Sequence, residues 1–417
     1  MTVLTIIHLE KLRPWFIVAV FFSLLVACQK DTDAPTEYKY LVDYKLNKVY
    51  SADAIKTMLL IQSLLYPEIN DIEEYIDYGV QVYQVNYKTL YRDSVIEASG
   101  LVCVPANQAD FPVISFQNGT NTSHDNAPSV NPSNPNYILM EAMASNGYVV
   151  LITDYIGFGS SSDIVHPYYH RTSSDNAVID LLNAFNEMDE YDLFQANSNN
   201  KLYLMGYSQG GWATLSAMDT IENDMALNMD IGAVSCGAGA YSLLPMSEYV
   251  LGLETFPGPL YLPYYLYAHQ FYGAISAPLS VFFKDPYNMI IPSLFDGSLE
   301  NDAVNAELTT QMADLVTDNM RNNFTTDETF TELRQALESS SIAGWHTTVH
   351  LRFYHGTADE HVPPQQSLLV YNSFVEAGTS TDVVKHIPKE GLNHGTCLIP
   401  WGIETIKWFN ILETTNK

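Results

Sequence analysis

A serine set between glycines is the residue in this chain best suited to covalent chemistry. The segment GYSQG (206–210) follows the pattern G-x-S-x-G and stands where an apolar run ends and a helical pattern begins. A strand, a sharp turn and a helix in this order form a nucleophile elbow, which exposes the serine hydroxyl at the edge of a sheet. In such a turn a β-carbon at Gly206 or Gly210 would collide with its neighbours. We therefore predict that Ser208 is a nucleophile.

A serine hydroxyl needs a base that removes its proton and an acidic residue that orients the base. In a fold with this elbow the partners follow the serine in the order Asp or Glu, then His, in loops after later strands. Asp359 follows the apolar run 348–354, and His394 follows the run 383–387. We predict Asp359 and His394 as the partners of Ser208, with Glu360 as the alternative to Asp359.

The negative charge that develops on an attacked carbonyl needs two backbone NH donors. One comes from the residue after the nucleophile, here Gln209, and the other from the loop after an early strand. The segment SFQNGT (115–120) ends such a strand in a turn, so the NH of Asn118 is our candidate, a plain turn being the alternative.

No metal site is predicted, because spacings of four and five residues on a strand keep three histidines from converging, namely His346, His350 and His355.

The elements that must hold these residues alternate between short apolar runs and helical patterns. Apolar runs interleaved with helices are typical of a mostly parallel, doubly wound sheet in an α/β protein. A helix between the N-cap Ser51 and Pro67 and an antiparallel hairpin of 80–90 and 95–104 precede them. The predicted strands are 112–116, 148–153, 201–205, 231–235, 348–354 and 383–387, and the predicted helices are 175–188, 210–221, 364–377 and 396–412.

The interval 241–345 breaks this alternation. It has no clean strand pattern and many prolines, and half of the run 261–272 is aromatic. So much aromatic surface faces a core, a partner or a ligand. We interpret the interval as an inserted helical cap that selects apolar acyl groups, with core packing as the alternative. The α/β core would then have a first part, 37–240, and a second part, 346–417.

Composition limits what the chain can bind. Of its 417 residues, 47% are hydrophobic and 16% are charged, which excludes a disordered chain. The 48 acidic and 19 basic residues give a net charge of −29, which would repel a phosphate backbone. Four cysteines without a C-x-x-C pair are too few for a disulfide scaffold. Nucleic acid is therefore not expected as a partner.

The first residues have the pattern of an export signal. Lys11 and Arg13 precede an apolar stretch, 15–27, which is too short to cross a bilayer as a helix. It has the length of a signal-peptide core. We predict a signal peptide over residues 1–27.

The segment LVAC (25–28) resembles the bacterial lipobox, whose cysteine receives diacylglycerol and becomes the new N-terminus. Residues 28–36 are polar, as expected of a tether between a lipid anchor and a folded body. Their acidic residues resemble the export tag of surface-exposed lipoproteins of the Bacteroidetes. We predict an outer-membrane lipoprotein of the bacterial cell envelope, anchored through Cys28, with an ordinary cleaved signal as the alternative.

Five segments together resemble the secretory lipase branch of the α/β-hydrolases, and above all its bacterial lipoprotein members. The resemblance extends from about residue 75 to the C-terminus, less closely across the cap, and the family often has Asp where Asn118 stands. It implies the α/β-hydrolase fold and hydrolysis of carboxylic esters through an acyl-enzyme, without a metal or organic cofactor. The segments are SFQNGT (115–120), DYIGFG (154–159), HPYYH (166–170), GYSQGG (206–211) and HGTADEHVP (355–363).

The leading hypothesis is a serine esterase or lipase whose substrate is an ester with an apolar acyl group. A serine exopeptidase of the same fold is one alternative, in which Glu248 and Glu254 at the start of the cap could hold a substrate ammonium group. A glycan-ester hydrolase is another, because tyrosine-rich walls stack sugars as readily as they contact acyl chains. A binding protein on this scaffold would be expected to lack one of the three reactive residues, and none is missing. The alcohol portion and the oligomeric state stay open.

Overall fold

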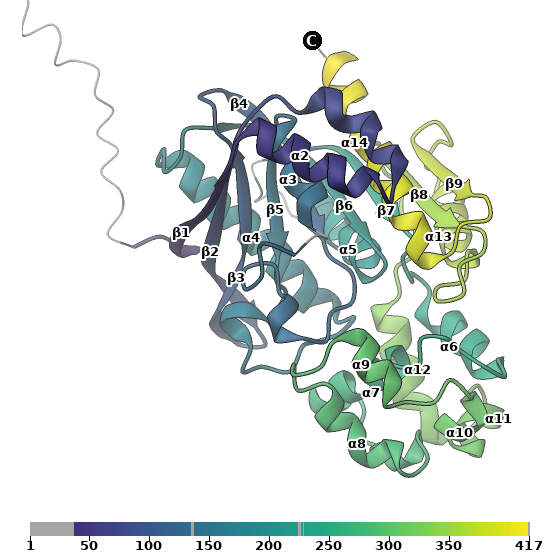
Figure 1. Ribbon diagram of the computed structural model, residues 1–417. Coiled ribbons are helices and arrows are strands. Elements are labelled where there is room, and N and C mark those ends of the chain that lie inside the picture. The colour runs from purple at the N-terminus through teal and green to yellow at the C-terminus, as the bar shows by residue number, and fades with distance from the viewer. Residues whose placement is uncertain (1–36, 135–136, 224–226, 228, 416–417) are drawn as a thin grey trace, which may run out of the picture. The chain divides into compact units, whose positions relative to one another are not determined.

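One mixed sheet runs through the part of the chain that this computed structural model describes, residues 37–134, 137–223, 227 and 229–415. Its strand order is β1-β2-β3-β5-β4-β6-β7-β8-β9 (Figure 1). Strands β1, β2 and β3 pair antiparallel, and the strands from β5 to β9 pair parallel. In chain order the strands are Leu41–Tyr50, Val80–Tyr91, Ser94–Pro105, Asp110–Gln117, Val149–Thr153, Asn197–Tyr207, Asp230–Gly237, His350–Gly356 and Val384–Lys389.

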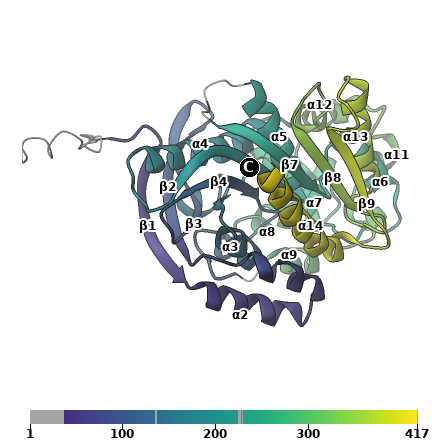
Figure 2. The same ribbon diagram turned by 90° about the horizontal axis from the view of Figure 1, so that it is seen from above.

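Helices cover both faces of this sheet (Figure 2). The helices of the two faces contribute to two separate hydrophobic cores. One face carries α2 (Ala52–Ser63), α3 (Ile138–Ser145) and α14 (His394–Thr415), and the other carries α4 (Arg171–Glu190), α5 (Gln209–Asn223) and α13 (Gln365–Glu376). This arrangement confirms the predicted doubly wound sheet.

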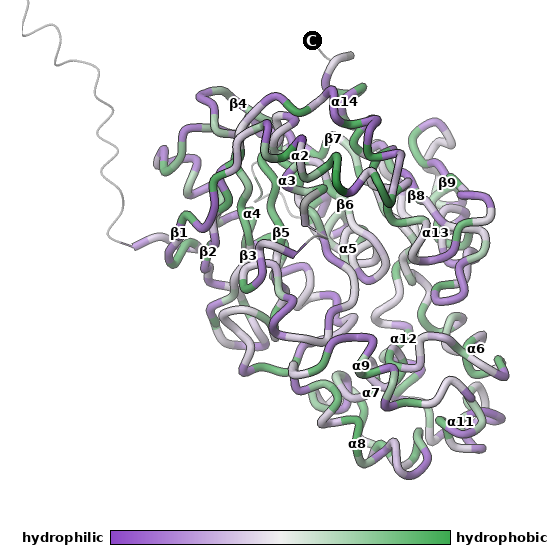
Figure 3. Tube along the Cα trace, in the orientation of Figure 1, coloured by the Kyte–Doolittle hydropathy of each residue, from purple (hydrophilic) through white to green (hydrophobic). Residues whose placement is uncertain are grey.

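The side chains of β6 show why residues 202–205, in the second half of the strand, form a continuous apolar run. Successive side chains of a strand point to opposite faces. Leu202 and Leu204 lie in the core on one face, and Tyr203 and Met205 lie in the core on the other. All four are fully buried, and Figure 3 shows hydrophobic residues along the central strands. A strand buried on both faces has no position left for a polar side chain.

Between β7 and β8 the described residues form seven α-helices and no strand of the sheet. We call residues 241–345 the cap segment. Its buried apolar residues belong to the same core as those of α4 and α5, so the cap segment packs as part of the α/β core rather than as a separate body. Figure 1 shows its helices grouped below the sheet: α6 (Leu243–Gly252), α7 (Tyr261–Phe271), α8 (Tyr287–Leu294), α9 (Asn301–Ala306), α10 (Met312–Leu315), α11 (Asp318–Asn323) and α12 (Thr331–Ser340).

Most of the predicted elements are confirmed, and the differences have physical causes. The side chain of Ser51 caps α2 by accepting a hydrogen bond from the NH of Ala54, at 3.1 Å. Strand β1 was not among the predicted strands, although Val42, Tyr44 and Leu46 alternate with polar residues along it; because it is an edge strand, these side chains stay more than a third exposed. The short helix α3 was not predicted either.

The N-terminal predictions fall on residues that are not described. The signal peptide (1–27), the tether (28–36) and the lipidated Cys28 all lie outside the described residues. Within the described ranges, no helix is both long and apolar enough to cross a bilayer.

Glu141 is a carboxyl group buried under the sheet in α3, with 3% of its surface exposed. Burial raises its pKa from 4.5 to about 7, although the positive charge of Lys48 opposes this shift. The folded protein therefore holds this proton more tightly than the unfolded chain does. The free energy of unfolding therefore falls as the pH rises from about 4.5 to about 7 and is constant above that range. The total loss is up to about 3 kcal/mol.

Glu141→Gln should remove this loss, because a buried amide carries no charge at any pH. We expect the variant to have a higher Tm than the parent protein at pH 8 and nearly the same Tm at pH 5, as measured by circular dichroism. Glu68→Gln, at an exposed glutamate, is the control, and its Tm should match that of the parent protein at both pH values. A Glu141→Gln variant less stable than the parent at pH 8 would contradict this account.

Candidate active site

Ser208 occupies a strained turn between β6 and α5. Its φ angle is 60°, in the left-handed region that residues other than glycine rarely adopt. Its NH donates to the carbonyl oxygen of Gly237 at 2.8 Å. A β-carbon at Gly206 would lie 2.3 Å from the carbonyl oxygen of Gly210, and one at Gly210 would lie 1.9 Å from that of Gln117. The predicted need for glycine at both positions is confirmed.

Three loops at the carboxyl ends of parallel strands bring Ser208, Asp359 and His394 together. Nε2 of His394 lies 3.0 Å from Oγ of Ser208, and its Nδ1 lies 2.6 Å from Oδ2 of Asp359. Because a carboxylate only accepts, Nδ1 carries the proton and Nε2 is free to accept the serine proton. Glu360, the alternative to Asp359, is exposed to solvent.

Asp359 is a buried carboxylate held by several donors. Its Oδ1 accepts the NH groups of His361 and Val362, both at 2.9 Å. Nε2 of His355 lies 3.3 Å from its Oδ2. Burial acts to raise the pKa of Asp359, but the hydrogen bonds from His355 and His394 outweigh it and hold that pKa well below its usual range. Asp359 is therefore ionised.

His355, which the sequence presented only as a possible metal ligand, lies beside Asp359. Its Nδ1 lies 2.7 Å from Oγ of Ser367, and its Nε2 lies 2.9 Å from the carbonyl oxygen of Val362. The spacing of four residues between His355 and Asp359 was the available signal. The described residues contain no cluster of three or more side chains that could hold a metal ion.

The side chain of Gln209 is fixed by His166, to which the sequence assigned no role. Nε2 of Gln209 donates to Nε2 of His166 at 3.1 Å, and Nδ1 of His166 donates to the carbonyl oxygen of Ile156 at 2.7 Å. These partners require a neutral imidazole with its proton on Nδ1. Burial lowers the pKa of His166 to about 4, which keeps it neutral at pH 7.

Asn118 follows β4 and lies against the elbow. Its carbonyl oxygen accepts the hydroxyl of Tyr155 at 3.1 Å, and a β-carbon at Gly119 would lie 3.7 Å from Cβ of Ser208. The structure thus brings Asn118 and Gln209, the two predicted NH donors, to the immediate surroundings of Ser208.

Asp154 braces the loop that follows β5. Its carboxylate accepts the hydroxyl of Ser99 at 2.6 Å and the NH of Ser129 at 2.8 Å. Burial raises the pKa of Asp154, and these hydrogen bonds oppose that shift. Asp154 therefore ties the loop after β5 to β3 and to the loop that carries Ser129.

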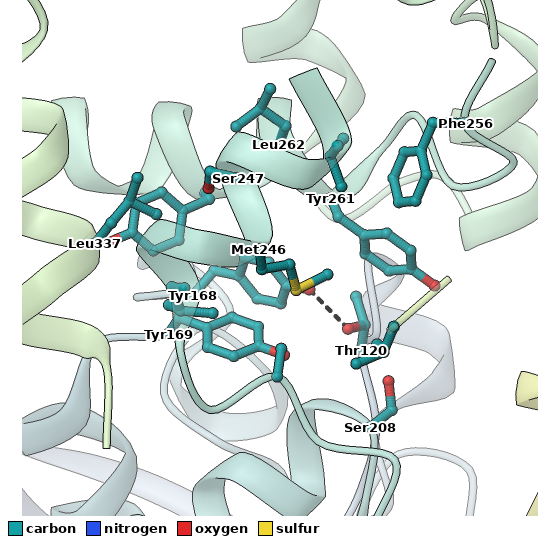
Figure 4. Close-up of a pocket in the computed structure, with 15 residues that line it drawn as sticks. Thr120, Tyr168, Tyr169, Ser208, Met246, Ser247, Phe256, Tyr261, Leu262 and Leu337 are labelled. Carbon is teal, nitrogen blue, oxygen red and sulfur yellow. Dashed lines mark hydrogen bonds between the residues drawn. The ribbon is translucent and has the colours of Figure 1, made fainter. Parts of the chain in front are cut away.

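A largely apolar pocket opens at Ser208 and extends into the cap segment (Figure 4). It encloses about 640 Å³. Figure 4 places Leu262 and Ser247 at the end away from Ser208. The lining residues are Thr120, Tyr168, Tyr169, Ser208, Ala240, Leu243, Met246, Ser247, Val250, Phe256, Tyr261, Leu262, Tyr265, Leu337 and Val362.

The aromatic residues of α7 divide between the pocket and the core. Tyr261 and Tyr265 line the pocket. Tyr264 instead stacks between the rings of Tyr168 and Phe295, with centroid distances of 4.3 and 4.4 Å. The aromatic run therefore contributes both to the wall of the pocket and to core packing.

Two comparisons with known proteins identify the fold and the family. Residues 136–397 match the family described as serine aminopeptidase, S33. A protein of Legionella pneumophila described as a hydrolase is 25% identical, with a TM-score of 0.80 over 90% of this chain and 98% of that one. The rice cell wall degrading esterase LipA from Xanthomonas oryzae is 22% identical, with a TM-score of 0.76 over 90% and 97%.

Candida antarctica lipase A in its closed state is 15% identical, with a TM-score of 0.61 over 88% of this chain and 82% of that one. Comparison with curated proteins gives no match. The family and the shared folds show that this protein is a serine hydrolase with the α/β-hydrolase fold.

His166→Leu should lower kcat for a nitrophenyl ester by about tenfold or more, because the buried amide of Gln209 would lose its acceptor. His166→Gln, whose carbonyl oxygen restores an acceptor, should recover most of that loss. KM should change less than kcat in both variants. Steady-state kinetics on variants with native circular dichroism spectra test this. Equal kcat values for the two variants would show that the hydrogen bond to Gln209 has no influence on the reaction.

Proposed function

This chain belongs to the serine aminopeptidase S33 family, and we propose that it cleaves carboxylic esters with apolar acyl groups rather than peptides. The observation that carries the proposal is the apolar pocket that opens at Ser208. An acyl chain loses its contact with water in such a pocket, which favours binding by roughly 25 cal/mol per Å² of buried apolar surface. Two solved structures of this fold are named as an esterase and a lipase, in agreement with the proposal.

In the proposed reaction His394 acts as the base. Its Nε2 removes the proton of Ser208 as Oγ bonds to the ester carbonyl carbon, and the carbonyl oxygen becomes an oxyanion. The backbone NH groups of Gln209 and Asn118 donate to that oxyanion. Asp359 stabilises the imidazolium that forms, because its ionised carboxylate accepts a hydrogen bond from the Nδ1–H group of His394.

Collapse of this intermediate breaks the bond to the alcohol. His394 gives its proton to the departing oxygen, so the alcohol leaves neutral and the acyl group stays on Oγ of Ser208. Water then attacks the acyl-enzyme with His394 again as the base, and the carboxylic acid leaves. His394 takes each proton from Ser208 or water and gives it to the departing alcohol or back to Oγ of Ser208, so the protons balance over the cycle.

A serine exopeptidase is the alternative within the same family. Holding a substrate ammonium group requires carboxylates inside the binding site. Glu248 and Glu254, the candidates for this role, are exposed, and neither lines the pocket at Ser208. This arrangement favours the ester substrate.

Ser208→Ala should abolish labelling by a fluorophosphonate probe and lower ester turnover by about 10³-fold or more. Ser339→Ala, at an exposed serine of α12, is the control and should keep both the labelling and the ester turnover of the parent protein. Labelling is read by mass spectrometry of the modified peptide. Undiminished hydrolysis by the Ser208→Ala variant would refute the nucleophile assignment, and faster turnover of aminoacyl amides than of every ester would establish the peptidase.

The efficiency kcat/KM should rise several-fold from acetate to butyrate or hexanoate esters, because each buried methylene contributes up to ~0.8 kcal/mol. Ser247→Phe should lower kcat/KM for the butyrate and hexanoate esters and leave kcat/KM for the acetate ester unchanged, since Ser247 lies at the end of the pocket away from Ser208. Ser293→Phe, on the exposed surface of α8, is the matched control. A flat chain-length profile in the unmodified protein would contradict the assignment of this pocket to the acyl group.

A further inference from the structure

A second, larger cleft lies on the other side of the loop that follows β4. It encloses about 1130 Å³ and is lined by that loop, by residues near α3 and by the start of α9. Its lining residues are Phe116, Asn118, Gly119, Thr120, Asn121, Asn126, Asn134, Tyr137, Tyr207, Glu300, Asn301, Asp302 and Leu398.

This polar cleft and the acyl pocket meet at the reacting serine. Thr120 lines both of them. Gly119 lines the polar cleft, and its backbone contacts Ser208 so closely that a β-carbon there would lie 3.7 Å from Cβ of Ser208. An ester whose acyl chain fills the apolar pocket therefore directs its alcohol portion toward the polar cleft.

The lining of the polar cleft differs in chemistry from that of the acyl pocket. The amides of Asn121 and Asn301 are hydrogen-bonded within the chain, whereas Asn118 and Asn126 contribute amide groups to the lining, and the rings of Phe116 and Tyr137 contribute apolar surface. Glu300 and Asp302 carry carboxylates at the exposed rim. The described residues that line the cleft include no lysine, arginine or histidine. The cleft thus offers hydrogen bonds to a neutral molecule and repels an anion.

Asn118 adds an independent indication of a ligand. Its side chain is 7% exposed, and its Oδ1 has no hydrogen-bond partner among the described residues. A buried polar atom without a partner costs about 1–3 kcal/mol. A hydroxyl group bound at this end of the cleft would supply the missing donor.

From this geometry we infer that the polar cleft binds the alcohol portion of the substrate and that this portion is a neutral polyhydroxylated alcohol, such as a sugar unit. The inference rests on the proposed ester hydrolysis and adds the class of alcohol. The hydroxyl groups of such an alcohol bond to Oδ1 of Asn118 and to the amide of Asn126, and the aromatic surfaces pack against the apolar face of a sugar ring. The rim carboxylates exclude alcohols that carry a phosphate or a carboxylate.

The test compares butyrate esters that share one acyl group and differ in the alcohol. The substrates are methyl 6-O-butyryl-glucoside, 2-methoxyethyl butyrate and butyrylcholine. We expect kcat/KM for the glucoside to exceed that for the methoxyethyl ester by about tenfold or more, the effect of one or two well-formed hydrogen bonds. Equal values would overturn the inference while leaving ester hydrolysis established, and a preference for choline would assign the cleft to a cation. Failure to cleave any of the three would refute the proposed function itself.

A pair of variants ties the preference to the cleft. Asn126→Leu removes an amide from the lining of the cleft and should lower kcat/KM for the glucoside about tenfold. The value of kcat/KM for the methoxyethyl ester should change less than about twofold. Asn107→Leu, at an exposed asparagine outside the cleft, should change neither. An Asn126→Leu variant that keeps the full preference for the glucoside would show that the sugar binds elsewhere. If this variant does not fold, the ranking of the three substrates by the unmodified protein decides whether the alcohol portion is a sugar-like alcohol.

Discussion

The close approach of backbone to backbone at the elbow is the constraint on which the site depends. Ser208 reaches the edge of the sheet only because its φ angle is 60°. That turn brings Gly210 so near to the end of β4 that a β-carbon would lie 1.9 Å from the carbonyl oxygen of Gln117. Two glycines thus set the distance between the start of α5 and the loop that carries Asn118. The candidate NH donors lie next to each other because no side chain separates the two segments.

The sequence predicted the residues whose chemistry dictates their type and order. A nucleophilic serine needs a histidine and a carboxylate, and parallel strands place them after later strands, so Ser208, Asp359 and His394 could be found from spacing. Continuous apolar runs likewise revealed the strands that are buried on both faces. His166 could not be found in this way, because its position depends on Gln209, 43 residues away. Strand β1 carries a different signal, an alternation of Val42, Tyr44 and Leu46 with polar residues, which a search for continuous apolar runs does not detect.

The cap segment is joined to the reacting site by hydrogen bonds as well as by its apolar core. Nδ2 of Asn301 donates to the carbonyl oxygen of Thr120 at 2.8 Å, and Oγ1 of Thr122 donates to that of Leu299 at 2.8 Å. The NH of His124 donates to the carbonyl oxygen of Gly297 at 2.8 Å. The loop that follows β4 is therefore held by the cap segment. Any displacement of α9 would move the loop that carries Asn118, so the cap helps to set the geometry of the reaction as well as the shape of the pocket.

The same dependence extends to the protonation state of His166. Its ring lies 5.8 Å from that of Tyr264 in the cap segment and 5.0 Å from that of Phe158, measured between centroids. These aromatic rings contribute to the burial of His166, and burial is what lowers its pKa to about 4. A neutral His166 keeps the lone pair on Nε2 that the side chain of Gln209 requires. An aromatic residue of the cap therefore acts on the proposed NH donor at Gln209 without touching it, by keeping the histidine between them uncharged.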